Sequence, residues 1–248
     1  MSNSESKQNR ERRHFDMLAD NCGEIWWGST TLAGIYRLRR RSALIKRELE
    51  LKKNISVLEI GCGTGALTRY VLEIMPDLSL FCCDVSGNSI AIARKRYVGY
   101  RHAKFFAADV TALPFQDNHF DMVIGNSILH HLPLDNALRE CRRVLRNDGV
   151  AVFFEPNMLN PQIAIEKNIK FVGKLLQNSE EETAFFRWRL AADFIKCGFR
   201  SVNIEPFDFL HPAIPSCFIG GIQWLGAILE KAKGFKEISG SLFIKARK

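Results

Sequence analysis

The fold is decided by residues 57–65, which read Val-Leu-Glu-Ile-Gly-Cys-Gly-Thr-Gly. A short apolar run leads into three glycines at alternate positions, and an apolar helical pattern follows over Gly65–Met75. Glycines in such a turn let backbone N–H groups come close to a ligand, and the N-terminus of the next helix favours negative charge. The stretch therefore predicts a strand, a ligand-binding turn and a helix.

Strands and helices alternate on the C-terminal side of this turn. The expected strands are Ile55–Ile60, Leu78–Cys83, Ala103–Ala108, Asp121–Gly125 and Val150–Phe154. The helices expected between them are Gly65–Met75, Ser86–Tyr97 and Leu134–Leu145. Near-continuous apolar strands joined by such helices are typical of a parallel sheet that is covered on both faces. The predicted fold is therefore α/β, with a doubly wound, mostly parallel sheet.

The segments on either side of this core are less regular. Helical patterns over about 12–20 and 29–52 predict an N-terminal helical lid, residues 1–53, on a domain that spans 54–248. The rhythm changes after the fifth strand, where two cap insertions are expected at about 158–185 and 207–235. The elements expected beyond that strand are helices at 160–176 and Phe185–Cys197 and strands at Ser201–Ile204 and Ser241–Ala246.

The glycine turn alone is compatible with two classes of enzyme. Gly61, Gly63 and Ala66 also satisfy the dinucleotide fingerprint of nicotinamide and flavin enzymes. Glu59 favours the other class, because a carboxylate beside the turn would repel a pyrophosphate but would suit an ammonium or sulfonium group. Asp109, after the third strand, could accept a hydrogen bond from an adenine amino group. Both acids lie at the carboxyl ends of strands, where such sheets bind ligands.

Further motifs extend this pattern along the chain. They are E-I-G-C-G-T-G at 59–65, an acid that ends the second strand, A-D-V-T-A-L-P-F at 108–115, L-H-H-L at 129–132 and R-V-L-R-N-D-G at 143–149. With these motifs in this order, residues of about 55–155 resemble the class I S-adenosylmethionine-dependent methyltransferases, especially the small-molecule branch that includes quinone and sterol methyltransferases. The resemblance is weaker before and after this region.

The resemblance implies S-adenosyl-L-methionine as the cofactor and gives a role to each matching residue. Glu59 and the turn formed by Gly61, Gly63 and Gly65 would hold the methionine end. Asp84 would bind the ribose hydroxyls and Val85 would pack on adenine. The edge and face of adenine would meet Asp109 and Val110, and Asn126 would contact the cofactor from the fourth strand. Asp84, Asp109 and Asn126 could instead be only turn or capping residues.

Three residues are candidates for work on the methyl acceptor. Methyl transfer from a sulfonium needs alignment and a dry site, and it needs a base only where the acceptor's proton must leave. His131 and His130 follow the fourth strand and could supply that base, or one could cap the turn while the other packs below it. Glu155 ends the fifth strand and could bind the acceptor. No cysteine–histidine spacing predicts a metal site.

The composition says less about the acceptor. The formal charge of +8 favours anionic partners. Many of the basic residues cluster on or just after the expected second helix, and they are Arg37, Arg39, Arg40, Arg41, Lys46, Arg47, Lys52 and Lys53. This cluster is either the solvated face of that helix or a site for an acidic substrate. The motif after the fourth strand is not the Asn-Pro-Pro-aromatic type used on flipped bases, which disfavours nucleic acid.

Residues 209–229 contain no Asp, Glu, Lys or Arg. Pro215 restricts a helix to about 16 residues, or about 24 Å, which is too short for a hydrocarbon core of about 30 Å. We expect Phe218, Ile219, Ile222, Leu225 and Leu229 to share one face that packs over the core or the acceptor pocket. A surface that touches a membrane and a dimer seam are the other interpretations of this run.

The sequence thus predicts an S-adenosylmethionine-dependent enzyme that methylates a small or lipid-linked acceptor. O-methylation is favoured over C- or N-methylation, and a sugar or glycan intermediate is among the candidate acceptors. The polar N-terminus favours a cytoplasmic protein, with peripheral membrane contact as an option. Three alternatives stay open: C-methylation of a quinone-like acceptor, a nicotinamide-dependent oxidoreductase, and a non-catalytic cofactor-binding partner subunit. The sequence does not predict the oligomeric state.

Overall fold

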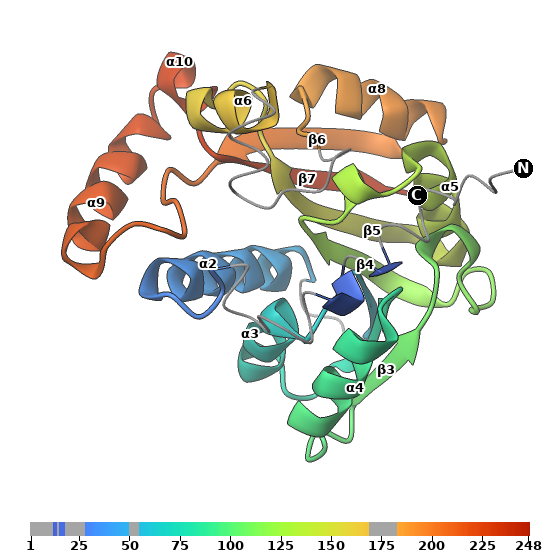
Figure 1. Ribbon diagram of the computed structural model, residues 1–248. Helices are drawn as coiled ribbons and strands as arrows, with labels where there is room; N and C mark the ends of the chain where they lie inside the picture. The colour runs from blue at the N-terminus through green and yellow to red at the C-terminus, as the bar shows by residue number, and fades with distance from the viewer. Residues whose placement is uncertain (1–11, 14, 18–27, 50–54, 169–182) are drawn as a thin grey trace, which may run out of the picture.

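The computed structural model describes residues 12–13, 15–17, 28–49, 55–168 and 183–248. These residues form a seven-stranded sheet with the strand order β3-β2-β1-β4-β5-β7-β6 and helices on both faces (Figure 1). The strands are β1 (Ser56–Ile60), β2 (Ser79–Asp84), β3 (Ala103–Ala107), β4 (Phe120–Asn126), β5 (Leu145–Pro156), β6 (Arg200–Phe207) and β7 (Ser241–Arg247). The predicted doubly wound, mostly parallel α/β fold is confirmed.

Strands β1 to β5 pair in parallel, whereas β7 lies antiparallel between β5 and β6. The described helices are α2 (Leu32–Glu48), α3 (Ala66–Ile74), α4 (Gly87–Arg96), α5 (Leu134–Val144), α6 (Pro161–Asn168), α8 (Arg187–Lys196), α9 (Ile219–Leu229) and α10 (Lys233–Lys236). Three short 3-10 turns are also described. Turn η1 (Val110–Ala112) follows β3, η2 (Leu129–His131) follows β4, and η3 (Ser216–Phe218) precedes α9.

The sheet divides the buried core into two clusters, one on each face, and strand β1 contributes to both. Val57 belongs to the buried cluster that includes residues of α2, α3 and α4. Leu58 and Ile60 belong to the cluster on the opposite face, with residues of α5 and α8. Because successive side chains of a strand point to opposite faces, a strand covered on both sides must be apolar throughout. This double burial produces the continuous apolar run in the sequence.

Some predicted boundaries differ from the structure. Strand β5 begins at Leu145, five residues before the predicted start, because 145–149 continue the strand instead of forming a separate turn. The pairing with β4 shifts there, and Asp148 takes a positive φ of 62°. Strand β6 extends to Phe207. Residues 12–13 and 15–17 of the helix predicted at 12–20 are helical, whereas its other residues, the end of the helix predicted at 160–176 and the boundary at residue 53 lie outside the described residues.

Helices α9 and α10 form an arm that stands clear of the sheet, at the left of Figure 1. Ile219 of α9 is buried in a small cluster with Ala33 of α2 and Leu210, and Ile222 packs against that cluster. The predicted buried face is wrong in part, because Phe218 and Leu225 are 61% and 48% exposed. Within the described part of the chain, no helix has the length and apolar character needed to cross a membrane.

Candidate active site

A pocket lies where the glycine turn, the ends of the central strands and helix α2 meet. Nine of the residues proposed from the sequence line it, and these are Glu59, Gly61, Gly63, Asp84, Val85, Asp109, Val110, Asn126 and His131. They come from β1, β2 and β4 and from the turns that follow β1 to β4. Gly65, His130 and Glu155 are not among the lining residues. These nine residues are up to about 70 positions apart in the sequence, and the fold brings them to one pocket.

Two glycines of the turn are required by its shape. Gly61 has a φ of 61°, and a Cβ there would come within 2.5 Å of the Ile128 side chain. Gly65 has a φ of 90°, and a Cβ there would come within 2.5 Å of the Tyr97 ring. The Tyr97 hydroxyl donates a hydrogen bond to the Gly65 carbonyl over 2.6 Å. Gly65 therefore holds the start of α3 against the end of α4, and its part in the site is to shape the turn.

The acids after β2 and β3 have structural partners and also line the pocket. Asp84 accepts hydrogen bonds from the backbone N–H groups of Gly63, at 2.8 Å, and Ser86, at 2.9 Å. Burial raises the pKa of Asp84, although the two hydrogen bonds act in the opposite direction and lower it. Asp109 accepts from the backbone N–H and the hydroxyl of Thr111, both at 2.8 Å. Each carboxylate fixes a turn while it remains at the pocket wall.

Glu59 lies in the pocket wall and is only 2% exposed. Its Oε2 atom accepts a hydrogen bond from the Thr68 hydroxyl at 2.7 Å and a weaker one from the Cys82 thiol at 3.7 Å. Burial raises the pKa of Glu59 to about 7, against the effect of those bonds. A cation placed next to Glu59 would favour its ionised form.

The turn after β4 separates the three residues proposed to act on the acceptor. His131 lines the pocket, and its ring meets the edge of the Phe15 ring at a centroid distance of 5.2 Å. His130 is buried below it, with Nδ1 2.6 Å from the Glu155 Oε2 atom. Glu155 Oε1 accepts hydrogen bonds from the backbone N–H groups of Ile128, at 2.9 Å, and Leu129, at 2.8 Å.

Contrary to the prediction from the sequence, Glu155 and His130 therefore do not face the pocket but are buried behind its wall. The chain turns back after β4, so that the turn covers the end of β5 and encloses Glu155, which is 1% exposed. Both residues support the turn from behind the pocket wall, and His131 is the member of the three that reaches the pocket.

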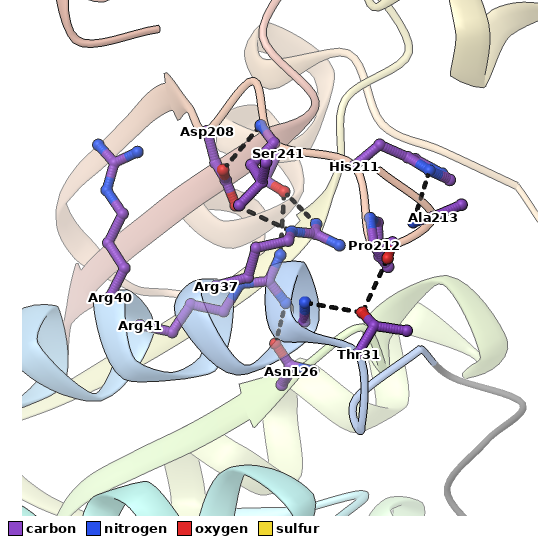
Figure 2. Close-up of polar contacts among 12 residues, drawn as sticks. Thr31, Arg37, Arg40, Arg41, Asn126, Asp208, His211, Pro212, Ala213 and Ser241 are labelled. Atoms are coloured by element: carbon purple, nitrogen blue, oxygen red, sulfur yellow. Dashed lines mark hydrogen bonds and ion pairs between the residues drawn. The ribbon is translucent and has the colours of Figure 1, made fainter. Parts of the chain in front are cut away.

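The wall that α2 contributes contains two arginines of the basic cluster that the sequence predicts as a solvated helix face or as a site for an acidic substrate. Arg37 and Arg41 line the pocket, and Figure 2 shows both side chains between α2 and the C-terminal segments. Their spacing of four residues on a helix was the available signal, because such residues share one face. Arg39 and Arg40 are exposed, as a solvated helix face predicts.

Comparisons with known proteins agree with this geometry. Residues 57–149 match the model of a methyltransferase domain family. The chain is 29% identical over 178 residues to a malonyl-[acyl-carrier protein] O-methyltransferase of Geobacter sulfurreducens, which covers 69% of this chain and 66% of that protein. It is 27% identical over 191 residues to a demethylmenaquinone methyltransferase of Staphylococcus aureus, with 72% and 77% covered.

The chain is a class I S-adenosylmethionine-dependent methyltransferase. Solved structures of this type share its fold at low identity. A methyltransferase of Thermotoga maritima, described as a possible histamine N-methyltransferase, has a TM-score of 0.66 at 17% identity and covers 96% of this chain and 99% of its own. Phosphoethanolamine N-methyltransferase 2 of Haemonchus contortus, solved with S-adenosyl-L-methionine, has a TM-score of 0.67 at 16% identity, with 94% and 60% covered.

The pocket of this methyltransferase fits its cofactor, S-adenosylmethionine, in charge and in shape. The buried Glu59 offers a negative group for the cationic end of the cofactor. At Gly63 a Cβ would meet no protein atom within 4 Å, so the turn is open on that side. Asp84 and Asp109 supply acceptors and Val85 and Val110 supply apolar surface along the same wall.

Proposed function

We propose that this methyltransferase methylates a hydroxyl oxygen of a small or lipid-linked acceptor, and that His131 removes the hydroxyl proton. The observation that carries the proposal is the presence of His131 in the same pocket as the residues suited to the cofactor. A histidine in that place can accept a proton as the new carbon–oxygen bond forms.

In this proposal the cofactor is held along the wall formed by the ends of β1, β2 and β3. Glu59 binds the ammonium end, Asp84 binds the ribose hydroxyls, and Asp109 with Val110 binds adenine. When bound, S-adenosylmethionine supplies an electrophilic methyl group on its sulfonium. The protein's own contribution is to orient the acceptor, exclude water and accept one proton.

Glu155 and His130 act in this proposal as positioning residues. The Glu155 carboxylate holds the Ile128 and Leu129 amides and the His130 ring, and this fixes the turn on which His131 stands. The His130 and His131 rings lie 4.1 Å apart between centroids, so the His130 ring packs directly beside the His131 ring.

The lipid-linked class of acceptor is supported by the exposed side of the arm. We define the α9 surface as Phe218, Trp224, Leu225, Ile228 and Phe235, which are 47–69% exposed. Lys231 and Lys233 follow α9 in the chain. Exposed aromatic and aliphatic side chains beside lysines suit the interface of an anionic membrane.

C-methylation of a quinone-like acceptor is the second candidate, favoured by the similarity to a demethylmenaquinone methyltransferase. The two candidates differ in the atom that receives the methyl group. Incubation of the enzyme with isotope-labelled S-adenosylmethionine and fractionated cell extracts, followed by mass spectrometry of the product, identifies that atom. A labelled methyl ether supports the first candidate, and a new carbon–methyl bond supports the second.

The role of His131 is tested with two substitutions. We expect His131→Ala to lower turnover by about 10²–10⁴-fold, because positioned proton transfer contributes that much to rate. His131→Gln, which forms hydrogen bonds but is a poor base, should be nearly as slow. The affinity for S-adenosylhomocysteine, measured by calorimetry, should stay within about threefold of the parent, as expected when only the chemical step is affected.

The control is His102→Gln, which removes an exposed histidine outside the pocket and should leave turnover unchanged. Near-normal turnover of the His131→Gln variant would reject the proton-transfer role, while cofactor binding would still be intact.

A further inference from the structure

The face of α2 that meets the C-terminal segments carries three arginines with different electrostatic surroundings. Arg37 donates from Nε to the Asp208 carboxylate over 2.9 Å, and Asp208 is 3% exposed. Arg40 forms a two-bonded pair with the Glu230 carboxylate. Two of the three cations are thus neutralised by a carboxylate of the C-terminal part of the chain.

Arg41 is the exception among these three. It is 5% exposed, and its guanidinium donates to the Asn126 side-chain oxygen and, over 3.0 Å, to the Ser241 hydroxyl. Both partners are neutral, the Nε atom has no hydrogen-bond partner in the described structure, and no described carboxylate lies within ion-pair distance of the group. The Phe154 ring, 5.6 Å from the guanidinium carbon, gives weaker compensation.

The Arg41 guanidinium remains a cation at neutral pH. Burial and the nearby Arg37 charge lower the pKa of Arg41 to about 9, against the opposing effect of the more distant Asp208 and Glu155 carboxylates. A buried cation without a direct ion pair is unfavourable, so an anion bound beside the Arg41 guanidinium would stabilise this arrangement. Because Arg41 lines the pocket, the missing anion would come from a molecule bound there.

The position of Arg41 in the sheet order indicates which molecule supplies the anion. Its two partners stand at the end of β4 and at the start of β7, and the order β2-β1-β4-β5-β7 places β7 on the side away from Asp84. His131 also follows β4. Arg41 is therefore on the His131 side of the pocket, opposite the wall that suits adenosine.

We propose that Arg41, with Arg37 one turn before it, binds an anionic group of the acceptor, a phosphate or a carboxylate. This proposal rests on the proposed function, because it names the acceptor class of the same pocket. The planar guanidinium has a free Nε donor for an oxyanion, and Arg37 adds a second positive charge beside it. Methylation would then take place on a hydroxyl that is a short distance from the anionic group.

The experiment uses the full chain loaded with S-adenosylhomocysteine and inorganic phosphate as the probe. We expect phosphate to raise the thermal midpoint of the loaded parent, and the Arg41→Met variant to bind phosphate at least fivefold more weakly in calorimetry. Arg39→Met removes an exposed arginine of the same helix and should bind phosphate like the parent. Arg41→Lys keeps the charge in case the methionine variant fails to fold, and it should retain a measurable phosphate effect.

The cofactor's own carboxylate is the competing source of the anion, and a second arm separates the two. S-adenosylhomocysteine carries that carboxylate and 5′-methylthioadenosine lacks it. We expect Arg41→Met to change the affinity for both by less than threefold. A tenfold loss for S-adenosylhomocysteine alone would assign Arg41 to the cofactor and overturn the proposal. Equal phosphate binding by all variants would also overturn it. Failure of the parent to bind S-adenosylhomocysteine would instead contradict the proposed function.

Discussion

At the scale of single residues, one buried carboxylate shapes the turn that carries His131. Glu155 accepts two backbone hydrogen bonds and contacts His130, so its oxygens are occupied within the protein. An acid at the end of a strand therefore has two readings from sequence, a ligand to substrate or an internal anchor. Nothing in the residue type distinguishes them, because the choice depends on how the following turn folds back over the strand.

A second buried acid gives a prediction about pH. The pKa of Glu59 is raised to about 7, so in the ligand-free protein the protonated form is favoured. Its contribution to folding stability is full below the ordinary carboxyl pKa and is lost as the pH rises through about 7. The affinity for the cofactor should instead increase with pH, because a cationic ligand binds more tightly when the Glu59 carboxyl is ionised. We expect affinity for S-adenosylhomocysteine to increase between pH 5.5 and 7.5, by up to about tenfold per unit below the pKa.

Calorimetry across this range measures the trend. The Glu59→Gln variant should bind S-adenosylhomocysteine more weakly at pH 7.5, and its affinity should lose most of the pH dependence. Burial also raises the pKa of Asp84, so the loss of pH dependence in this variant assigns the effect to Glu59 and not to Asp84. Glu73→Gln, an exposed acid paired with Arg69, is the matched control. A parent affinity that does not vary with pH would contradict a cationic group next to Glu59.

At the scale of elements, the strands of the central sheet could be predicted and the arm could not. The central strands β1, β4 and β5 are buried on two faces over most of their length, which imposes an apolar run that is visible in the sequence. Helix α9 is also apolar throughout, yet only Ile219 and Gly226 are buried. The face that packs depends on the contact with Ala33 and Leu210, which are far away in the sequence. Helical periodicity cannot select a face when all faces are apolar.

The arm permits a paired comparison of two similar residues. Ile222 packs against the cluster of Ala33, Leu210 and Ile219, whereas Leu225 is 48% exposed. We expect Ile222→Ser to lower the free energy of unfolding by about 1–2 kcal/mol, from lost apolar burial. Leu225→Ser should change it by less than about 0.5 kcal/mol. Urea denaturation measures both values, and equal losses would mean that the arm packs by a different face.

At the scale of the whole molecule, the exposed arm gives the protein one side suited to a lipid surface. We expect the parent to sediment with vesicles of phosphatidylcholine and phosphatidylglycerol, and much less with phosphatidylcholine alone, because the lysines after α9 add electrostatic attraction. Combined Trp224→Ser, Leu225→Ser and Ile228→Ser substitutions should reduce sedimentation at least fivefold. Val98→Ser, at a position that is 88% exposed and outside the α9 surface, should leave it unchanged.

Salt separates this interpretation from simple adhesion. Raising the ionic strength should weaken the binding of the parent, since attraction between exposed charges is screened. Sedimentation of the triple variant at the parent level would exclude the α9 surface as the contact.

The pocket shows the same limit on sequence reasoning at molecular scale. Glu59, Asp84 and Asp109 could be placed together because each lies at or just after the carboxyl end of a strand of one parallel sheet. Arg41 could not, because its burial requires Asn126 and Ser241, which the chain brings together only when β7 joins the sheet. In the sequence, a cluster of arginines on a helix has the pattern of a solvated face. That Arg41 is buried instead depends on contacts with residues that are far away in the chain.

The place of β7 in the sheet has a consequence for biosynthesis. This strand is the last of the seven in chain order, yet it pairs with both β5 and β6. As the chain leaves the ribosome, β1 to β5 can assemble while β6 has no partner among them and β5 keeps an open edge. Ser241, the first residue of β7, also contacts both Arg37 and Arg41. The side of the pocket that carries Arg37 and Arg41 is thus completed only when β7 has been translated, so the strands that hold the proposed cofactor wall are made before the proposed acceptor site is complete.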